Sequence, residues 1–79
     1  MLNKNELKKL IAKSLNVNVS KINDKTKDVN LEEWDSLGQL SIISALDKKF
    51  KGEINFKDIA QANSIKLIEA YLKKKKVLK

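Results

Sequence analysis

The chain contains no proline and only two glycines in 79 residues. These two residue types interrupt helices, so their scarcity leaves few natural breaks and favours helical segments. In several stretches apolar residues recur at intervals of three and four, the spacing of one face of an α-helix. Because 42% of the residues are hydrophobic and only 5% aromatic, the core must be built mainly of leucine and isoleucine. We therefore predict an all-α fold.

Four helices are predicted, of which the third is short. The first covers about residues 4–15, and Asn3 with Glu6 has the spacing of a capping box at its start. The third is expected to begin after Asn55 and the fourth after Ser64, because asparagine and serine are good N-cap residues. The predicted architecture is a small four-helix bundle.

The second helix is predicted over about residues 36–51. Its apolar residues favour one buried face that consists of Leu40, Ile43, Leu46 and Phe50. Gly52 follows at the position where a glycine in the left-handed conformation often ends a helix.

The connection between the first two helices is unusually long. Residues 16–35 make about 20 residues, whereas bundle connections usually take about 2–8. The segment lacks the Gly/Ser/Pro-rich composition of a flexible linker, so we expect an ordered loop with its own turns, one of them capped by Ser20. Five apolar residues are expected to anchor it to the core: Val17, Val19, Ile22, Val29 and Leu31. The length of the chain predicts one domain over residues 1–79.

Two residue types needed for much enzyme chemistry are missing, because the chain has no cysteine and no histidine. It therefore has no thiol nucleophile, no disulfide, no zinc-finger ligands and no imidazole base. We predict that the protein is not an enzyme and has no catalytic or metal-ligating residues. No apolar signal segment opens the chain, and no run approaches the roughly 20 apolar residues of a membrane span. These features predict a cytoplasmic protein without an integral membrane segment.

Charge is unevenly distributed along the chain. The net charge of +7 arises from 17 basic residues, all of them lysine, and 10 acidic ones. Four acidic residues nevertheless precede the second helix with no lysine among them: Asp28, Glu32, Glu33 and Asp35. A basic helical module that binds nucleic acid is the main alternative function, and a protein adaptor is another. Against nucleic acid, lysine supplies only point charges, and the four aromatic residues are too dispersed to stack bases.

Ser36 is expected at the N-terminus of the second helix. Free backbone N–H groups and the helix dipole make that position favourable for a phosphate. Gly38 is expected to leave open space beside the serine. Ser36 and Gln39 also have the spacing of a capping box, however, and a helix cap is the commoner role of such a serine.

The string Trp34-Asp35-Ser36-Leu37-Gly38, which closes the long loop and opens an amphipathic helix, resembles the attachment motif of stand-alone acyl carrier proteins. Val19-Ser20-Lys21-Ile22 is similar to the turn in the first loop of that family. The resemblance covers nearly the whole chain, from the first helix through the long loop to the short third helix and the final helix.

The resemblance implies that Ser36 accepts 4′-phosphopantetheine from coenzyme A through a magnesium-using phosphopantetheinyl transferase. The terminal thiol would hold an acyl or aminoacyl group as a thioester and present it to loading and transfer enzymes. Asp35, Leu37 and Gly38 would serve partner recognition, and the carrier would be a monomer. In the family the cargo can retreat between the helices, a space that six residues could line here: Leu40, Ile43, Leu46, Ile54, Ile59 and Ile68. Ordinary core packing is the alternative role of each.

The second helix departs from that family's usual charge. Fatty-acid carriers typically present several carboxylates there, whereas this helix has Lys48, Lys49 and Lys51 with a single acid, Asp47. Gly38 also replaces the acidic residue that often follows the motif. Because rim charges set association rate and partner choice, a dedicated pathway becomes as plausible as lipid synthesis. Polysaccharide modification, aminoacyl transfer and secondary metabolism are the options.

Overall fold

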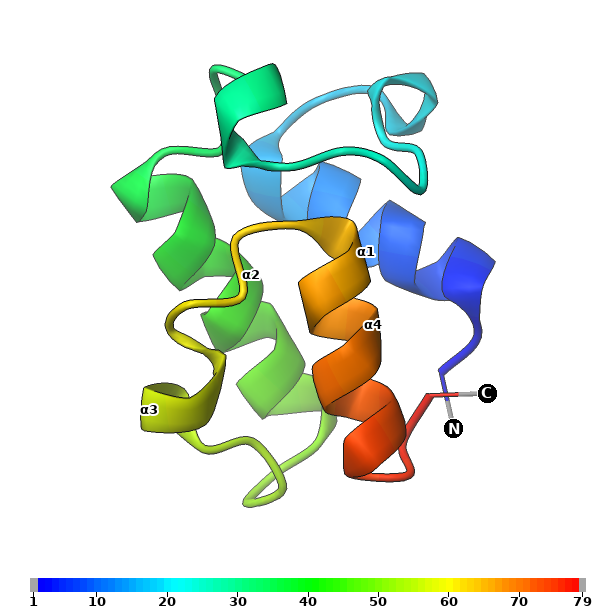
Figure 1. Cartoon of the computed structure of the whole chain (residues 1–79), viewed down its shortest axis with the longest axis vertical. Helices are drawn as coiled ribbons and strands as arrows, with labels where there is room; N and C mark the ends of the chain where they lie inside the picture. Colours follow the sequence, from blue (N-terminus) through cyan, green and yellow to red (C-terminus); the bar gives the residue numbers. More distant parts are fainter. Residues whose placement is uncertain (1, 79) are drawn as a thin grey trace.

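The computed structural model describes residues 2–78, which form a small bundle of four helices (Figure 1). Their bounds are Lys4–Leu15 (α1), Ser36–Lys49 (α2), Phe56–Ile59 (α3) and Ile65–Lys74 (α4). Between residues 2 and 78 there is no β-strand, only isolated bridges, one of which pairs Leu2 with Leu78 and brings the two chain ends side by side. The predicted all-α bundle is confirmed.

Three helices begin at the predicted capping residues. The Asn3 side chain accepts a hydrogen bond from the Glu6 backbone N–H, and the Glu6 carboxylate accepts one from the Asn3 N–H, which completes the capping box. Asn55 and Ser64 cap α3 and α4 through their side-chain oxygens. These local signals fix where the helices start because each satisfies backbone N–H groups that have no intrahelical acceptor.

The buried face of α2 differs from the predicted one. The residues that face inward are Gly38, Ile42, Ile43 and Leu46. Leu40 is 49% exposed, and Phe50 is a half-buried C-cap residue. Apolar residues occupy most of the circumference of this helix, so their spacing alone does not single out one face. The helix ends at Lys49, and Gly52 takes the left-handed conformation, with φ of 77°, in the turn that follows.

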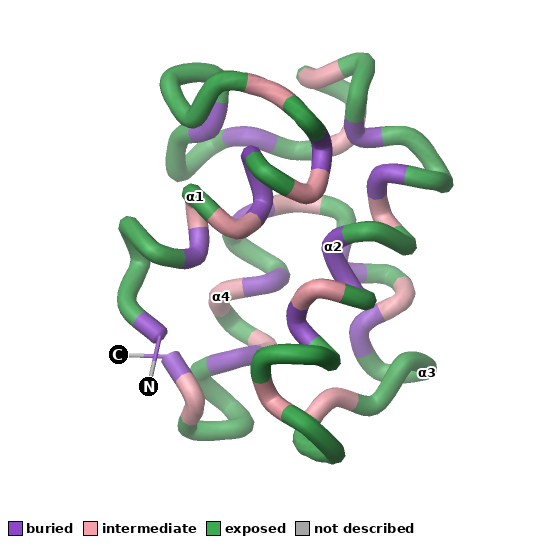
Figure 2. The backbone as a smooth tube through the Cα atoms, turned by 180° about the vertical axis from the view of Figure 1, so that it is seen from behind, coloured by how far each residue is buried: buried purple, intermediate pink, exposed green. Residues whose placement is uncertain are grey.

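The core is mainly aliphatic, as predicted, includes Trp34 and joins all four helices (Figure 2). Its most completely buried side chains are Leu2, Leu7, Ile11, Ile42, Leu46, Ile59, Ile65, Ile68 and Leu72. Burial of each such side chain contributes about 1.5–3 kcal/mol of transfer free energy. None of the helices in the described part of the chain is long and apolar enough to cross a membrane.

The long loop, residues 16–35, is ordered and crosses one end of the bundle (Figure 1). It contains two single turns of 3-10 helix, Val19–Lys21 (η1) and Asp28–Asn30 (η2). The Ile65 backbone N–H, at the start of α4, donates to the Thr26 carbonyl at 2.9 Å. The prediction of an ordered connection with its own turns is confirmed.

The contacts of the loop differ in detail from those predicted. Asn18, not Ser20, caps η1, because the Asn18 side chain accepts the Ser20 backbone N–H at 2.9 Å. Three of the five predicted anchors do pack against the core, namely Val17, Ile22 and Leu31. Val19 and Val29, which lie in the two 3-10 turns, are exposed.

An ion pair also joins the loop to α1. Lys8 Nζ lies 2.9 Å from Asp24 Oδ1. The hydrogen bond and the charge of Lys8 lower the pKa of the Asp24 carboxyl, which is itself exposed. The ionised carboxylate of Asp24 is therefore the form that stabilises the contact between the loop and α1.

Candidate functional site

Ser36 is the first residue of α2, and its side chain is exposed. The N-cap is Asp35, whose Oδ1 accepts the Gly38 backbone N–H at 2.8 Å. The alternative role of Ser36, a cap paired with Gln39, is therefore not the one that the structure shows. Within residues 2–78 the Ser36 hydroxyl makes no hydrogen bond. The backbone N–H groups of Ser36 and Leu37 precede the first hydrogen bond of the helix and have no intrahelical acceptor.

Trp34 fixes the direction in which α2 leaves the loop. Its side chain is only 2% exposed, and its Nε1–H donates to Gln39 Oε1 at 2.6 Å. The Gln39 amide in turn donates to the Ala62 carbonyl at 3.0 Å, in the segment between α3 and α4. One glutamine thus ties the loop, α2 and the α3–α4 connection together directly behind Ser36.

This arrangement was missed from the sequence, although a signal for it exists. With Asp35 as N-cap, Trp34 and Gln39 stand at the N′ and N4 positions, the spacing of the hydrophobic staple that sets the entry angle of a chain into a helix. Here the pair is joined by a hydrogen bond instead of an apolar contact.

Gly38 is buried, and the expected open space beside Ser36 is not there. A Cβ atom at this position would lie 2.5 Å from the Glu33 carbonyl oxygen and 2.6 Å from Leu15 Cδ2. The glycine lets the first turn of α2 approach both the loop and α1 closely. A buried residue offers no direct contact to a partner, so any effect of Gly38 on recognition would act through the seating of the helix.

The substitution Gly38→Ala is expected to destabilise the fold. Alanine improves intrinsic helix propensity by about 1 kcal/mol, but here its methyl group would overlap a backbone carbonyl. Overpacking of this kind costs about 1–3 kcal/mol, so we expect a lower free energy of unfolding in urea. Ser44→Ala, at an exposed position of the same helix, is the control and should change stability by less than about 0.5 kcal/mol. An unchanged or raised stability of Gly38→Ala would show that the neighbours yield without cost.

Large apolar side chains surround Ser36 on the surface. Leu37 is 74% exposed, Leu40 49% and Phe56, the first residue of α3, 54%. Asp35 and Leu37, the two predicted recognition residues next to the serine, both lie on this surface. Exposed apolar groups close together commonly mark a contact site.

Acidic residues lie on the loop side of Ser36. Glu32, Glu33 and Asp35 are exposed, and Asp28 is half-buried. The Asp28 carboxylate also accepts a hydrogen bond from the Asn63 side chain at 3.2 Å. We call Asp28, Glu32, Glu33 and Asp35 the acidic cluster. The part of the chain that the structure describes contains no group of three or more potential ligand residues arranged to hold a metal.

Two adjoining hollows lie along α2 and α3, with volumes of ≈ 580 Å³ and ≈ 430 Å³. Both are lined by Leu40, Ile43 and Phe56, and the larger one also borders Ser36. We call this strip the α2–α3 groove. It begins at the serine and ends near Ile54.

Half of the predicted lining residues line this groove. Leu40, Ile43 and Ile54 do so. Leu46, Ile59 and Ile68 line neither hollow and are fully buried, so core packing is their role in this structure. Phe56 was missed, although its place directly after the capping residue Asn55 puts it at the start of a helix that faces α2.

Comparison with family models gives a match over most of the chain. A family model described as the phosphopantetheine attachment site matches residues 5–72, from the first turn of α1 to near the end of α4. No curated protein and no solved structure gives a significant match.

Proposed function

Because the chain belongs to the phosphopantetheine attachment-site family, we propose that 4′-phosphopantetheine, which this family carries covalently, is attached to Ser36. The observation that carries this assignment is the exposed, unbonded hydroxyl at the start of α2. Two other serines are less suitable because their hydroxyls are hydrogen-bonded. The Ser14 hydroxyl donates to the Leu10 carbonyl, and the Ser64 hydroxyl caps α4.

Ser41 and Ser44 are exposed but lie inside α2, where the backbone N–H groups are used within the helix. At Ser36, by contrast, two N–H groups remain available to a phosphate oxygen. The residues present therefore suit a phosphate ester at this position.

The attachment reaction uses one atom of this chain. Ser36 Oγ would form the new bond to phosphorus as the pyrophosphate bond of coenzyme A breaks, and adenosine 3′,5′-bisphosphate would leave. The hydroxyl proton would pass to a base of the transferase or to water. The acidic cluster lies beside Ser36, so we propose that it contacts basic residues of the transferase.

The cofactor, when bound, supplies a terminal thiol that can hold cargo as a thioester, a group that the cysteine-free chain lacks. The family is a carrier module rather than a catalytic domain. We propose that the chain presents acyl or aminoacyl cargo to other enzymes and that the α2–α3 groove shields apolar cargo from water. The exposed Leu37 and Phe56 would contact those enzymes.

The pathway that we propose is a dedicated one. α2 carries two exposed lysines, Lys48 and Lys49, in its last turn and no acidic residue in its first. Partners built to bind an acidic second helix would be repelled. The alternatives of a nucleic-acid-binding module or an adaptor have only the net charge and the helical fold in their favour. A monomeric state and a cytoplasmic location remain predictions.

The proposed function predicts loading by a transferase. The purified chain is incubated with coenzyme A, magnesium and a broad-specificity phosphopantetheinyl transferase, and its intact mass is measured. We expect a gain equal to one phosphopantetheine group, located by peptide mapping to the fragment that contains Ser36. If several transferases leave the mass unchanged, this chain is not a functional carrier.

A further inference from the structure

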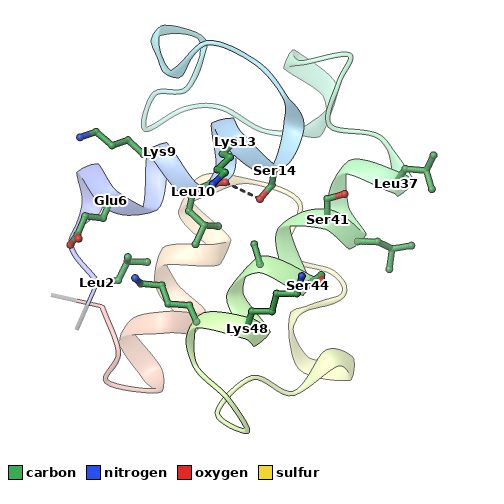
Figure 3. A pocket seen from close by; sticks show the side chains of 13 residues that line it. Leu2, Glu6, Lys9, Leu10, Lys13, Ser14, Leu37, Ser41, Ser44 and Lys48 are labelled. Carbon is green, nitrogen blue, oxygen red and sulfur yellow. Dashed lines mark hydrogen bonds between the residues drawn. The ribbon is translucent and has the colours of Figure 1, made fainter.

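A further hollow lies between α1 and α2 and shares Leu40 and Ser44 of α2 with the α2–α3 groove (Figure 3). Its volume is ≈ 1040 Å³. Leu10 projects into it from α1, and Leu40 and Ala45 line it from α2. Leu37, the residue after Ser36, lies at one end of it. We call this hollow the α1–α2 groove.

The edges of the groove are basic. Lys9 and Lys13 line it from α1, and Lys48 and Lys49 line it from α2. The one carboxylate in the lining belongs to Glu6, so the lining has a formal charge of +3. Glu6 is already used, because its carboxylate accepts the Asn3 backbone N–H.

These four lysines are uncommitted within the described part of the chain. The ion pairs between residues 2 and 78 are Lys4–Glu69 and Lys8–Asp24, and neither involves a lysine of the groove. All four groove lysines are exposed. An apolar floor between two rows of unpaired positive charge is therefore open to a partner of the opposite pattern.

We propose that the α1–α2 groove docks an acidic amphipathic helix of an enzyme that acts on the cargo. The groove runs between two helices, so a third helix could lay its apolar face on Leu10, Leu40 and Ala45. Acidic residues beside that face would meet the lysines. The apolar residues between lysines of two helices match the pattern of an amphipathic helix with acidic flanks. The proposal rests on the carrier function only for the identity of the partner.

The groove and the acidic cluster give the molecule two surfaces of opposite sign on either side of Ser36. A transferase that binds the acidic cluster would need a basic surface. An enzyme that acts on the cargo and binds the α1–α2 groove would need an acidic one. Leu37 lines the groove and adjoins Ser36, so an occupant of the groove would lie next to the attachment residue. Surface charge would then determine which of the two classes of partner binds on which side of Ser36.

The test uses a synthetic 18-residue peptide with leucine at helical spacing and glutamate on both flanks of the leucine face. It is titrated into the isotope-labelled full chain and followed by amide chemical shifts. We expect shifts at Lys13, Ser41, Ser44 and Ala45, and weaker binding as salt is raised. A peptide with lysine in place of glutamate should not bind.

Two variants locate the binding. Lys13→Glu combined with Lys48→Glu should weaken binding by about tenfold or more. The matched control, Lys57→Glu combined with Lys66→Glu, changes the net charge equally at exposed positions outside the groove and should weaken it by less than about twofold. Ala45→Phe fills the floor without a change of charge and should also weaken binding.

Several outcomes would overturn the proposal. Equal weakening by the groove pair and the control pair would mean that only net charge matters. Groove-dependent binding to phosphatidylglycerol/phosphatidylcholine vesicles, without binding to the peptide, would assign the groove to a membrane surface. Transferase loading of the variant with Lys13→Glu and Lys48→Glu is measured in parallel and should be unchanged. Failure of the docking proposal can thus be distinguished from failure of the proposed carrier function.

Discussion

Ser36→Ala is expected to abolish the transferase-dependent gain in mass completely. The variant lacks the oxygen that would form the bond to phosphorus, so no partial activity should remain. The side chain is exposed and its hydroxyl makes no hydrogen bond within residues 2–78. We therefore expect the free energy of unfolding to change by less than about 0.5 kcal/mol. Intact mass after incubation with coenzyme A measures the first effect, and urea denaturation measures the second.

Ser41→Ala is the matched control for this experiment. Ser41 is an exposed serine on the same helix, five residues further on. Its replacement should leave loading intact. A mass gain that persists in Ser36→Ala would place the attachment at another residue. Loss of loading in both variants would indicate that the recognition of α2 was disturbed and would leave the serine assignment unsupported.

Trp34→Ala is expected to remove a large part of the stability of the fold. Truncation of a buried tryptophan typically costs about 3–5 kcal/mol, since a large cavity remains. A chain of 79 residues has a total stability of roughly 4–12 kcal/mol at about 0.05–0.15 kcal/mol per residue. The substitution also removes the donor to Gln39 Oε1. Far-UV circular dichroism during urea denaturation should show a much lower midpoint or no folded baseline.

Trp34→Phe separates the two contributions. It keeps an aromatic ring in the core but leaves the half-buried Gln39 oxygen without its donor, at a cost of about 1–3 kcal/mol. Phe56→Ala, at an exposed aromatic residue, should change stability much less. If Trp34→Ala unfolds at the same urea concentration as the original chain, the loop is not what holds the start of α2 in place. Loading should follow the folded fraction in all three variants.

The parts of the fold that could be predicted from sequence depend on neighbouring residues. The capping box at Asn3 and the caps at Asn55 and Ser64 each act over two or three residues, so a short window contains the whole interaction. The inward face of α2 could not be predicted in this way. Ile42 is buried and Leu40 is 49% exposed, although both are large aliphatic residues, so the inward face depends on how the helices pack.

The candidate site likewise has features that depend on neighbouring residues and features that depend on distant ones. The helix start at Ser36 followed from local pattern and from the resemblance of residues 34–38. The closeness of Gly38 to Leu15 and the bond from Gln39 to Ala62 join segments more than 20 residues apart. Spacing along the chain does not show such contacts, and this is why open space was expected where the helix is in fact tightly seated.

The bridge between Leu2 and Leu78, next to which the Leu2 backbone N–H donates to the Val77 carbonyl at 2.9 Å, has a practical consequence. The two chain ends leave the bundle at one point, away from the end of α2 that bears Ser36 (Figure 1). This geometry suits insertion of the chain as a cassette into a surface turn of a host protein, because such insertions succeed where the ends lie close together. In such an insertion Ser36 would face away from the host protein, where enzymes fused to the same host could reach it.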